Sequence, residues 1–174
     1  MGGIVLPEVL NHFNVYSSGN KLIGVSGEVE LPDFEAITDT IEGSGIIGNL
    51  EEPVTGQFDS MQIKIPFSVL YEDMFSILDT TNPPTLTIRG SMQCMDPTTG
   101  ATDYYPVKVV VRGKAKTSKL GKMVKGKKME PEVEMEIQYI SVDINNKNVV
   151  TLDKLNFQYS INGKDLMAKI RTQC

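Results

Sequence analysis

Apolar and polar residues alternate along most of this chain with a period of two. The stretch "SMQIKIPFSV" shows the pattern, because Met61, Ile63 and Ile65 fall on one side of an extended backbone and Gln62 and Lys64 on the other. This is the spacing of a β-strand with one buried face. The same period predicts strands in "PTLTIRGSMQCM", "YYPVKVVVRGKAK", "EVEMEIQYISVDI" and "LDKLNFQYSINGKDL".

Turn-forming residues divide these strands. The tetrapeptide "SSGN" lies inside "FNVYSSGNKLIGVSGEVELP" and predicts an N-terminal β-hairpin over residues 13–31 that ends before Pro32. Later turns are predicted at Asn145-Asn146 and at Asn162-Gly163. We therefore expect about seven to nine strands.

One segment has a helical period instead. Its apolar residues are spaced as on one face of a helix: Leu70, Met74, Ile77 and Leu78. The pattern predicts a helix over residues 68–79, with Ser68 as the N-cap and Pro83-Pro84 preventing any continuation. So short a helix is not stable alone, and we expect it to pack on the sheet.

The order of these elements predicts the fold class. Because no helix separates most of the strands, the sheet is expected to be mainly antiparallel. We expect a mainly β protein, an antiparallel β-sandwich or barrel with one flanking helix and long loops. The 174 residues fit a single domain over 1–174.

Glycines produce a motif that resembles a nucleotide site. Residues 43–48, "GSGIIG", match G-x-G-x-x-G, a pattern that binds phosphate only between a buried strand and the start of a helix. Here Pro53 and Gly56 argue against a following helix, and Glu51-Glu52 would repel phosphate. We interpret residues 38–58 as a glycine-rich loop, either mobile or ordered by a partner.

Composition and motifs argue against an enzyme. His12 is the only histidine and the cysteines are Cys94 and Cys174, so ligands for a zinc site are too few and too scattered. No catalytic, cofactor or metal motif occurs, and we predict none of these sites. The sequence contains no run of about 18 apolar residues, so we predict no membrane anchor.

Charge is concentrated in two neighbouring strands. One carries basic residues of the same parity, Lys108, Arg112, Lys114 and Lys116, and the other carries Glu130, Glu132, Glu134 and Glu136. If the strands pair, each opposite-charge pair contributes about 0.2–1 kcal/mol. The simplest interpretation is a solvated sheet face. The functional alternative is a face that lines an aqueous space or binds a neighbouring subunit.

The basic segment over residues 108–128 permits a different class of function. It is rich in Lys and Arg and contains no Asp or Glu, although the net charge of the chain is -5. A small β-barrel could use it to bind nucleic acid or another ligand. Against this, the segment contains no aromatic residue on which a base would stack.

The segments together resemble a known family. "VLNHFNVYSSGNKLIGVSGEVELPDFE", "DTIEGSGIIGNLEEPVTGQFDSMQIKI" and "LDKLNFQYSINGKDLMAKIR" occur in the order found in the major tail tube proteins of contractile-tailed, P2-like bacteriophages. The resemblance implies a structural, non-enzymatic subunit. Six copies would form a ring, and rings would stack into a hollow tube inside a contractile sheath, in a phage tail or a tail-like bacteriocin.

The resemblance also implies partners and sites. The partners would be other copies, the sheath protein, and baseplate and tape-measure proteins, with assembly in the bacterial cytoplasm and transient passage of DNA or ions through the tube. Ile46, Ile47 and Leu50 would anchor the glycine-rich loop on a neighbouring subunit. The glutamates Glu130, Glu132, Glu134 and Glu136 would line the channel and repel phosphate. The Lys column would partly neutralise them, or would face the sheath.

Overall fold

The computed structural model describes residues 5–25 and 27–174, which form eleven strands and two short helices. In chain order these are β1 (Leu6–Ser17), β2 (Asn20–Lys21), β3 (Ala36–Ile41), β4 (Leu50–Phe58), β5 (Gln62–Pro66), α1 (Glu72–Ser76), β6 (Thr85–Met95), β7 (Thr102–Lys119), β8 (Glu132–Ile144), β9 (Lys147–Asp153), β10 (Gln158–Ile161), β11 (Lys164–Asp165) and α2 (Ala168–Gln173). The chain is mainly β, as the alternation of apolar residues predicted.

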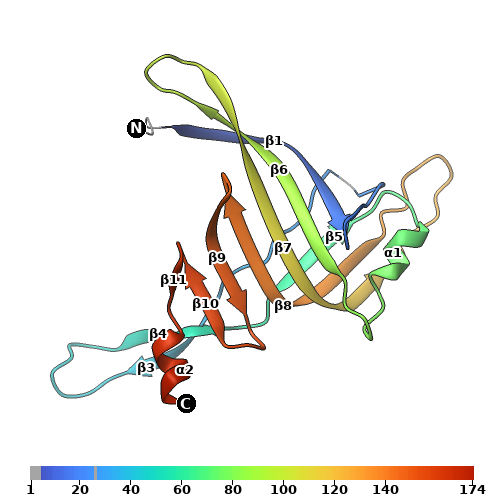
Figure 1. Ribbon diagram of the computed structural model, residues 1–174. Helices are drawn as coiled ribbons and strands as arrows, with labels where there is room; N and C mark the ends of the chain where they lie inside the picture. The colour runs from blue at the N-terminus through green and yellow to red at the C-terminus, as the bar shows by residue number, and fades with distance from the viewer. Residues whose placement is uncertain (1–4, 26) are drawn as a thin grey trace.

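Nine strands form one antiparallel sheet in the order β11-β10-β9-β8-β7-β6-β1-β2, with β5 pairing to β8 off this path. Strands β6, β7, β8 and β9 follow one another both in sequence and in the sheet (Figure 1). Hairpin connections therefore join them, and the longest is the loop over residues 120–131 between β7 and β8. At one turn Asn145 and Asn146 both have positive φ, as a two-residue hairpin turn requires.

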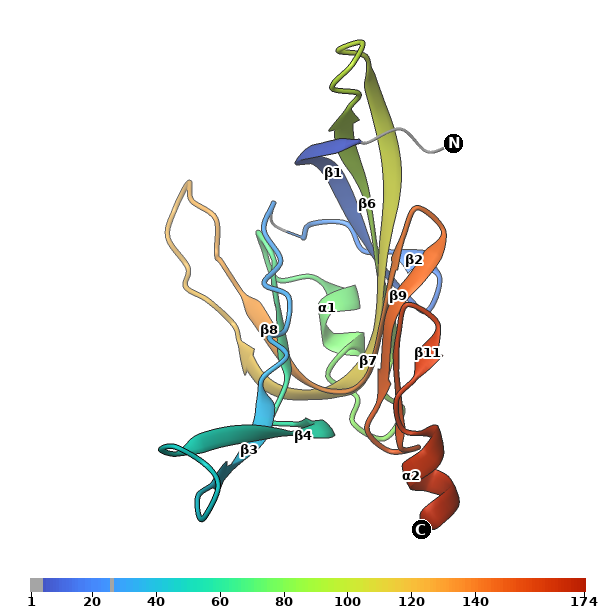
Figure 2. The ribbon, with the colours of Figure 1, turned by 90° about the vertical axis from the view of Figure 1, so that its left-hand side faces the viewer.

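The main sheet curves strongly around its own core. The first half of β8 pairs with β5 and the second half with β9, so two strands share one edge of β8 in succession. Figure 2 shows β7 and β8 bending through this region. The bend brings β5 and the start of β8 to face β1 and β6 across the interior.

One apolar cluster fills that interior. Its buried members come from both halves of the curved sheet and from α1: Val15, Met61, Ile63, Ile65, Phe67, Met74, Ile77, Leu86, Val111, Val133, Met135 and Ile140. The alternation of Met61, Ile63 and Ile65 is confirmed, since all three are buried. The predicted antiparallel β fold with a helix on its flank is therefore correct.

The flanking helix is shorter than the predicted range 68–79. Only Glu72–Ser76 is helical, and Tyr71 rather than Ser68 occupies the N-cap. The backbone N–H of Ser68 instead donates to the carbonyl of Gly24, which holds this residue in an extended connection. The helical spacing of the apolar residues was thus partly produced by an irregular segment that packs on the core.

The N-terminal hairpin over 13–31 forms only at its turn. Strand β2 ends at Lys21, after two residue pairs with β1. The chain then crosses to β5, where Val25 bridges Phe67 and Glu30 bridges Lys64. The alternation therefore reflects Val25 and Val29, which pack on the core without forming a continuous strand, whereas Leu31 is exposed.

Two regions differ more from the prediction. The glycine-rich range 38–58 is a β-hairpin built from β3 and β4, with a loop only between them. The segment directly after the Asn145-Asn146 turn, for which no strand was predicted, is strand β9, and helix α2 follows β11. Strand β9 lacks alternation because Val149 and Val150 are both half-buried.

Candidate functional site

The β3–β4 hairpin projects away from the main sheet. It forms a separate two-stranded sheet, and in both ribbon views it extends from the lower end of the molecule (Figures 1 and 2). An isolated two-stranded hairpin is only marginally stable in water. The hairpin therefore needs support from its base or from another molecule.

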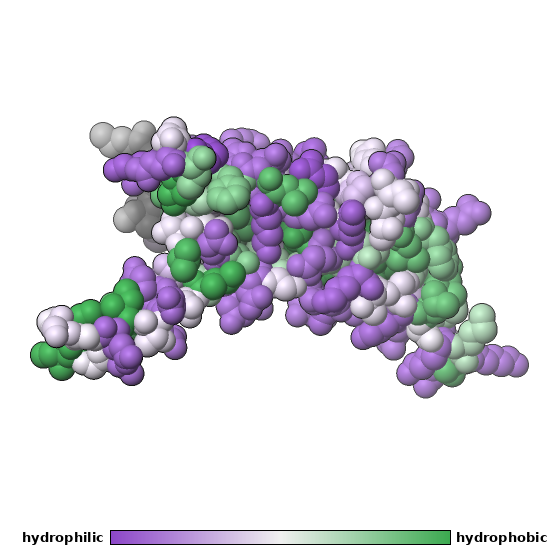
Figure 3. Space-filling view, turned by 90° about the horizontal axis from the view of Figure 1, so that it is seen from below, coloured by the Kyte–Doolittle hydropathy of each residue, from purple (hydrophilic) through white to green (hydrophobic). Residues whose placement is uncertain are grey.

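Exposed apolar residues are concentrated on this hairpin. Ile37, Ile41, Ile46, Ile47, Leu50 and Val54 are all exposed, and Ile47 at the tip is fully exposed. The space-filling view shows apolar side chains along the projecting arm (Figure 3). Ile46, Ile47 and Leu50, the predicted anchors, thus lie on one projecting element. Sequence analysis missed Ile37, Ile41 and Val54, which only the hairpin pairing adds to the same surface.

The base of the hairpin is fixed to the body. Phe58, at the end of β4, makes edge-to-face contacts with Phe34 and Tyr159 at ring-centroid distances of 5.5 and 5.1 Å. Burial raises the pKa of Tyr159 above its ordinary value. Gly56 has a φ of +75°, and an added Cβ there would lie 2.4 Å from the Met167 sulfur. The close passage past Met167 explains a glycine at this point.

The glycine motif forms the tip of the hairpin. Gly43, Gly45 and Gly48 all have positive φ, and the N–H of Ile46 donates to the carbonyl of Gly43 at 3.2 Å. Strand β4 follows the motif, whereas a dinucleotide fingerprint requires a helix there to hold the phosphates. The glycines therefore make a turn that displays Ile46 and Ile47.

The two charged strands pair as predicted. In the ladder between β7 and β8, Lys114 lies opposite Glu136 and Lys119 opposite Glu132, while on the other side Lys64 of β5 lies opposite Glu134. Lysines thus lie opposite the Glu column on both sides, Lys114 and Lys119 on β7 and Lys64 alone on β5.

Side-chain contacts balance these carboxylates. Ser60 donates to Glu136 at 2.7 Å, and Lys119 lies 3.8 Å from Glu132. With its amide nitrogen turned toward Glu134, Gln62 donates to Glu134 at 2.5 Å and accepts from the Lys116 ammonium at 2.7 Å. Glu132, Glu134 and Glu136 occupy alternate positions of β8, so they share one face of the strand, and each is half-buried.

Glu130 differs from the other three glutamates. It lies outside β8, is exposed, and has a φ of +57°. The residue therefore belongs to the loop before the strand. The column contains three glutamates rather than four, because alternation along β8 begins only at Glu132.

The basic segment 108–128 divides into two parts. Lys108 and Arg112 lie within β7 and face Asp143 and Asp153, at 3.1 and 4.0 Å. Burial alone would raise the pKa of Asp143, but hydrogen bonds from Asn148 and Lys108 outweigh it and lower the pKa. The remaining lysines belong mainly to an exposed loop between β7 and β8. The segment is therefore not one continuous basic patch.

The single histidine and the two cysteines lie on different parts of the fold. His12 is exposed on β1, Cys94 is buried and Cys174 is exposed. Over residues 5–25 and 27–174, no three His, Cys, Asp or Glu side chains are grouped so as to hold a metal ion. None of the described helices is long and apolar enough to cross a membrane.

Comparison with known proteins gives consistent matches. The family model for phage tail tube protein FII matches residues 7–174. The tail tube protein of Escherichia phage P2 is 26% identical over 175 residues, covering 97% of each chain. A sheath/tube terminator in the cryo-EM structure of an extracellular contractile injection system, PVC, in the extended state, has a similar fold, with a TM-score of 0.56, 12% identity, and coverage of 79% of this chain and 96% of that one.

These matches do not support the alternative of a nucleic-acid-binding β-barrel. The family is a structural one, so the chain is a tail tube subunit of a virion tail or tail-like particle. The chain belongs to the phage tail tube protein FII family.

Proposed function

We propose that six copies of this chain form a ring and that rings stack into the hollow inner tube of a contractile tail or tail-like particle. The observation that carries the proposal is the projecting β3–β4 hairpin with its exposed apolar residues. Exposed apolar surface of this kind is typical of a protein–protein interface. Family membership supports a copy of the same chain as the partner.

A tube requires two kinds of contact. A heterologous contact that closes by rotation makes a ring, and one that does not close makes a filament. The hairpin is suited to a heterologous contact, because it projects from one end and none of the described residues of the body covers Ile47 at its tip. The hairpin of each copy would therefore rest on a different surface of the next copy.

The free edge of β1 is a second candidate for contact between copies. Strand β1 pairs with β6 along most of its length, but its other edge meets β2 only at Tyr16 and Ser17. Leu6, Val9 and Leu10 are exposed along this strand. A neighbouring strand that pairs with this edge would satisfy its open backbone groups.

Electron microscopy of the purified chain tests the proposal. We expect the wild-type protein to form tubes with six-fold symmetry, and the double variant Ile46→Ser, Ile47→Ser to stay a folded monomer. Ile23→Ser is the matched control, because Ile23 is exposed but lies off the hairpin. A variant that still forms normal tubes would exclude the hairpin as an assembly element. A different rotational symmetry would exclude the hexamer.

We also propose that the outer face of β5, β8 and β7 lines the channel. Glu132, Glu134 and Glu136 lie there among lysines, with Glu130 at the end of the row. A face of nearly balanced charge holds few phosphates, so DNA passes without being retained.

Thiol labelling tests this placement. Glu134→Cys in a Cys174→Ser background places a single accessible thiol on the face, because Cys94 is buried. In assembled tubes a channel position should react with a small maleimide and not with a large polymer-linked maleimide. Reaction with both would place the face on the outside, and reaction with neither would place it in a subunit interface.

The remaining partners follow from the proposed tube. A contractile sheath would surround it, and baseplate and tape-measure proteins would set its start and length. The subunit would assemble in the bacterial cytoplasm, without a catalytic role or a membrane anchor. Co-assembly of the purified sheath protein on preformed tubes tests the first of these contacts.

A further inference from the structure

The loop between β7 and β8 combines positive charge with exposed apolar side chains. We call residues 120–128 the basic loop. Its cations are Lys122, Lys125, Lys127 and Lys128, and its apolar residues are Leu120, Met123 and Val124. All seven are exposed, and Met123 is 86% exposed. Lysines alone are usual on a solvated loop, but three exposed apolar residues among them indicate a contact surface.

Backbone hydrogen bonds hold the basic loop in one conformation. The N–H of Lys122 donates to the carbonyl of Met129 at 2.9 Å, and that of Lys127 donates to Val124 at 3.1 Å. The N–H of Met129 donates to Ser68, which fixes the base of the loop to the body. The loop therefore presents its side chains from a defined scaffold.

The β3–β4 hairpin has the opposite charge. Between Ala36 and Phe58 it contains Asp39, Glu42, Glu51 and Glu52 and no Lys or Arg. Asp39 lies directly opposite Glu52 in the strand pairing. Like charges in this position destabilise a hairpin, so its acidic face has a reason to bind cations.

Apolar residues lie beside this acidic pair. The pair Ile41 and Leu50 is two positions along the same ladder from Asp39 and Glu52, and side chains two residues apart on a strand share a face. One face of the hairpin thus carries an acidic pair next to an apolar pair. The basic loop carries the complementary combination.

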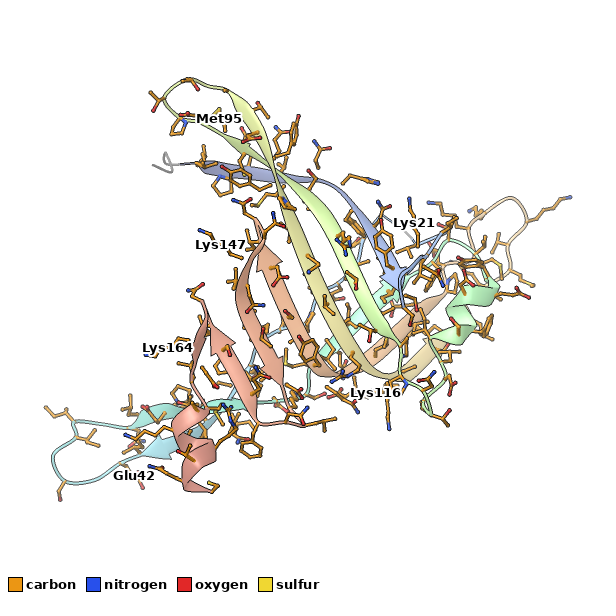
Figure 4. All side chains as sticks on the ribbon, in the orientation of Figure 1. Lys21, Glu42, Met95, Lys116, Lys147 and Lys164 are labelled. Atoms are coloured by element: carbon orange, nitrogen blue, oxygen red, sulfur yellow. The ribbon has the colours of Figure 1, made fainter. Side chains whose placement is uncertain are left out.

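Neither the basic loop nor the acidic face of the hairpin has its charge neutralised by the described residues. Among the described residues, no ion pair within 4.0 Å involves the four loop lysines or the four hairpin carboxylates. The loop and the hairpin lie at separate ends of the molecule in both ribbon views, and Glu42 is on the projecting hairpin (Figures 1, 2 and 4). A single copy cannot bring them together.

We propose that the basic loop of one copy is the docking surface for the acidic, apolar face of the β3–β4 hairpin of the next copy. The inference rests on the proposed tube and names the receptor of the hairpin. Nucleic acid would use the lysines but would leave Met123 and Val124 without a partner. The hairpin of another copy satisfies both the charges and the apolar side chains.

Charge reversal on each side tests this contact. The loop variant is Lys122→Glu, Lys125→Glu, and the hairpin variant is Asp39→Lys, Glu52→Lys. Each should raise the critical concentration for polymerisation about tenfold or more, since several interfacial ion pairs are replaced by repulsion. Lys147→Glu, Lys164→Glu is the matched control, because both lysines are exposed and lie outside the loop. Circular dichroism checks that each variant is folded.

Mixing the two variants gives the sharpest result. In an equimolar mixture acidic loops can pair with basic hairpins and basic loops with acidic hairpins, so polymers should form at a concentration at which neither variant polymerises alone. A mixture that stays unassembled would overturn the proposal, as would a loop variant that polymerises like wild type. Wild-type tubes in the same experiment would show that the proposed function survives this failure. Loss of oligonucleotide binding, rather than of assembly, in the loop variant would also overturn the proposal.

Discussion

The strand pair β5–β8 and the strand pair β3–β4 use isoleucine in opposite ways. In the body Ile63 and Ile65 have 0% exposure, whereas on the hairpin Ile41 and Ile47 are exposed. Both pairs are antiparallel, and the residue type is the same. The difference is the partner, because β5 finds the rest of the core within its own chain. We infer that the hairpin finds its partner on another copy.

The largest expected effect comes from truncating one isoleucine in each region. Ile63→Ala should lower the free energy of unfolding by about 2–5 kcal/mol, because it leaves a cavity in the core. Ile47→Ala should change it by less than about 0.5 kcal/mol, since its side chain is exposed. Urea denaturation of dilute, unassembled protein measures both values. Equal losses would mean that the tip of the hairpin is already part of the core.

A glycine at each end of the hairpin gives the next largest effect. Gly56→Ala should cost about 1–2 kcal/mol, because alanine is strained at positive φ and its Cβ would displace Met167. Gly48→Ala has a similar φ of +87° but nothing within 4 Å, so it should show the backbone cost alone. Thermal denaturation compares the two. If Gly48→Ala is as costly, packing against Met167 does not fix the base of the hairpin.

The acidic pair on the hairpin gives a smaller effect with the opposite sign. Glu52→Gln removes the like charge opposite Asp39 and should stabilise the hairpin by about 0.2–1 kcal/mol. Hydrogen exchange of the hairpin amides in unassembled protein measures this gain. The same variant should polymerise less readily. Improved assembly would show that these carboxylates do not meet lysines of another copy.

The smallest expected effect is a pH dependence in the body. Arg171 donates to Asp165 and lowers the pKa of that carboxyl below its ordinary value. Because the pKa of this carboxyl is lower in the folded state, its ionised form stabilises the fold at pH values above the pKa in the unfolded chain, about 3.9. This contribution to stability is lost as the pH falls through the pKa of the folded state. The protection factors of the α2 amides, which correct for the intrinsic pH dependence of exchange, should therefore fall in acid. Asp165→Asn should remove this dependence, and its persistence would assign it to another group.

The sequence predicted the body better than the hairpin. Strand β8 was predicted with its observed bounds, because Val133, Met135 and Ile137 alternate with charged residues and one side faces the core. Strands β3 and β4 lack this pattern, since beyond the base of the hairpin their described residues are exposed on both faces. A pattern that reflects burial within one copy cannot reveal an element whose partner is another copy.

The candidate site was only partly predictable for the same reason. Ile46, Ile47 and Leu50 could be selected as apolar residues among glycines, although their hairpin could not. The opposition of Asp39 and Glu52 depends on strand register, which the bulge after Ala36 shifts. The short helix α1 was overestimated because Leu70 and Leu78 pack on the core from outside it.

Hydrogen–deuterium exchange of the hairpin before and after polymerisation tests the central claim most directly. If the exposed apolar face of residues 37–54 is covered by another copy, its amides should exchange rapidly in unassembled protein and become strongly protected in tubes. The amides of β8 should be protected in both states, since β8 pairs with strands of the same chain on both sides. Tubes in which the hairpin amides still exchange as fast as in the free subunit would contradict the account.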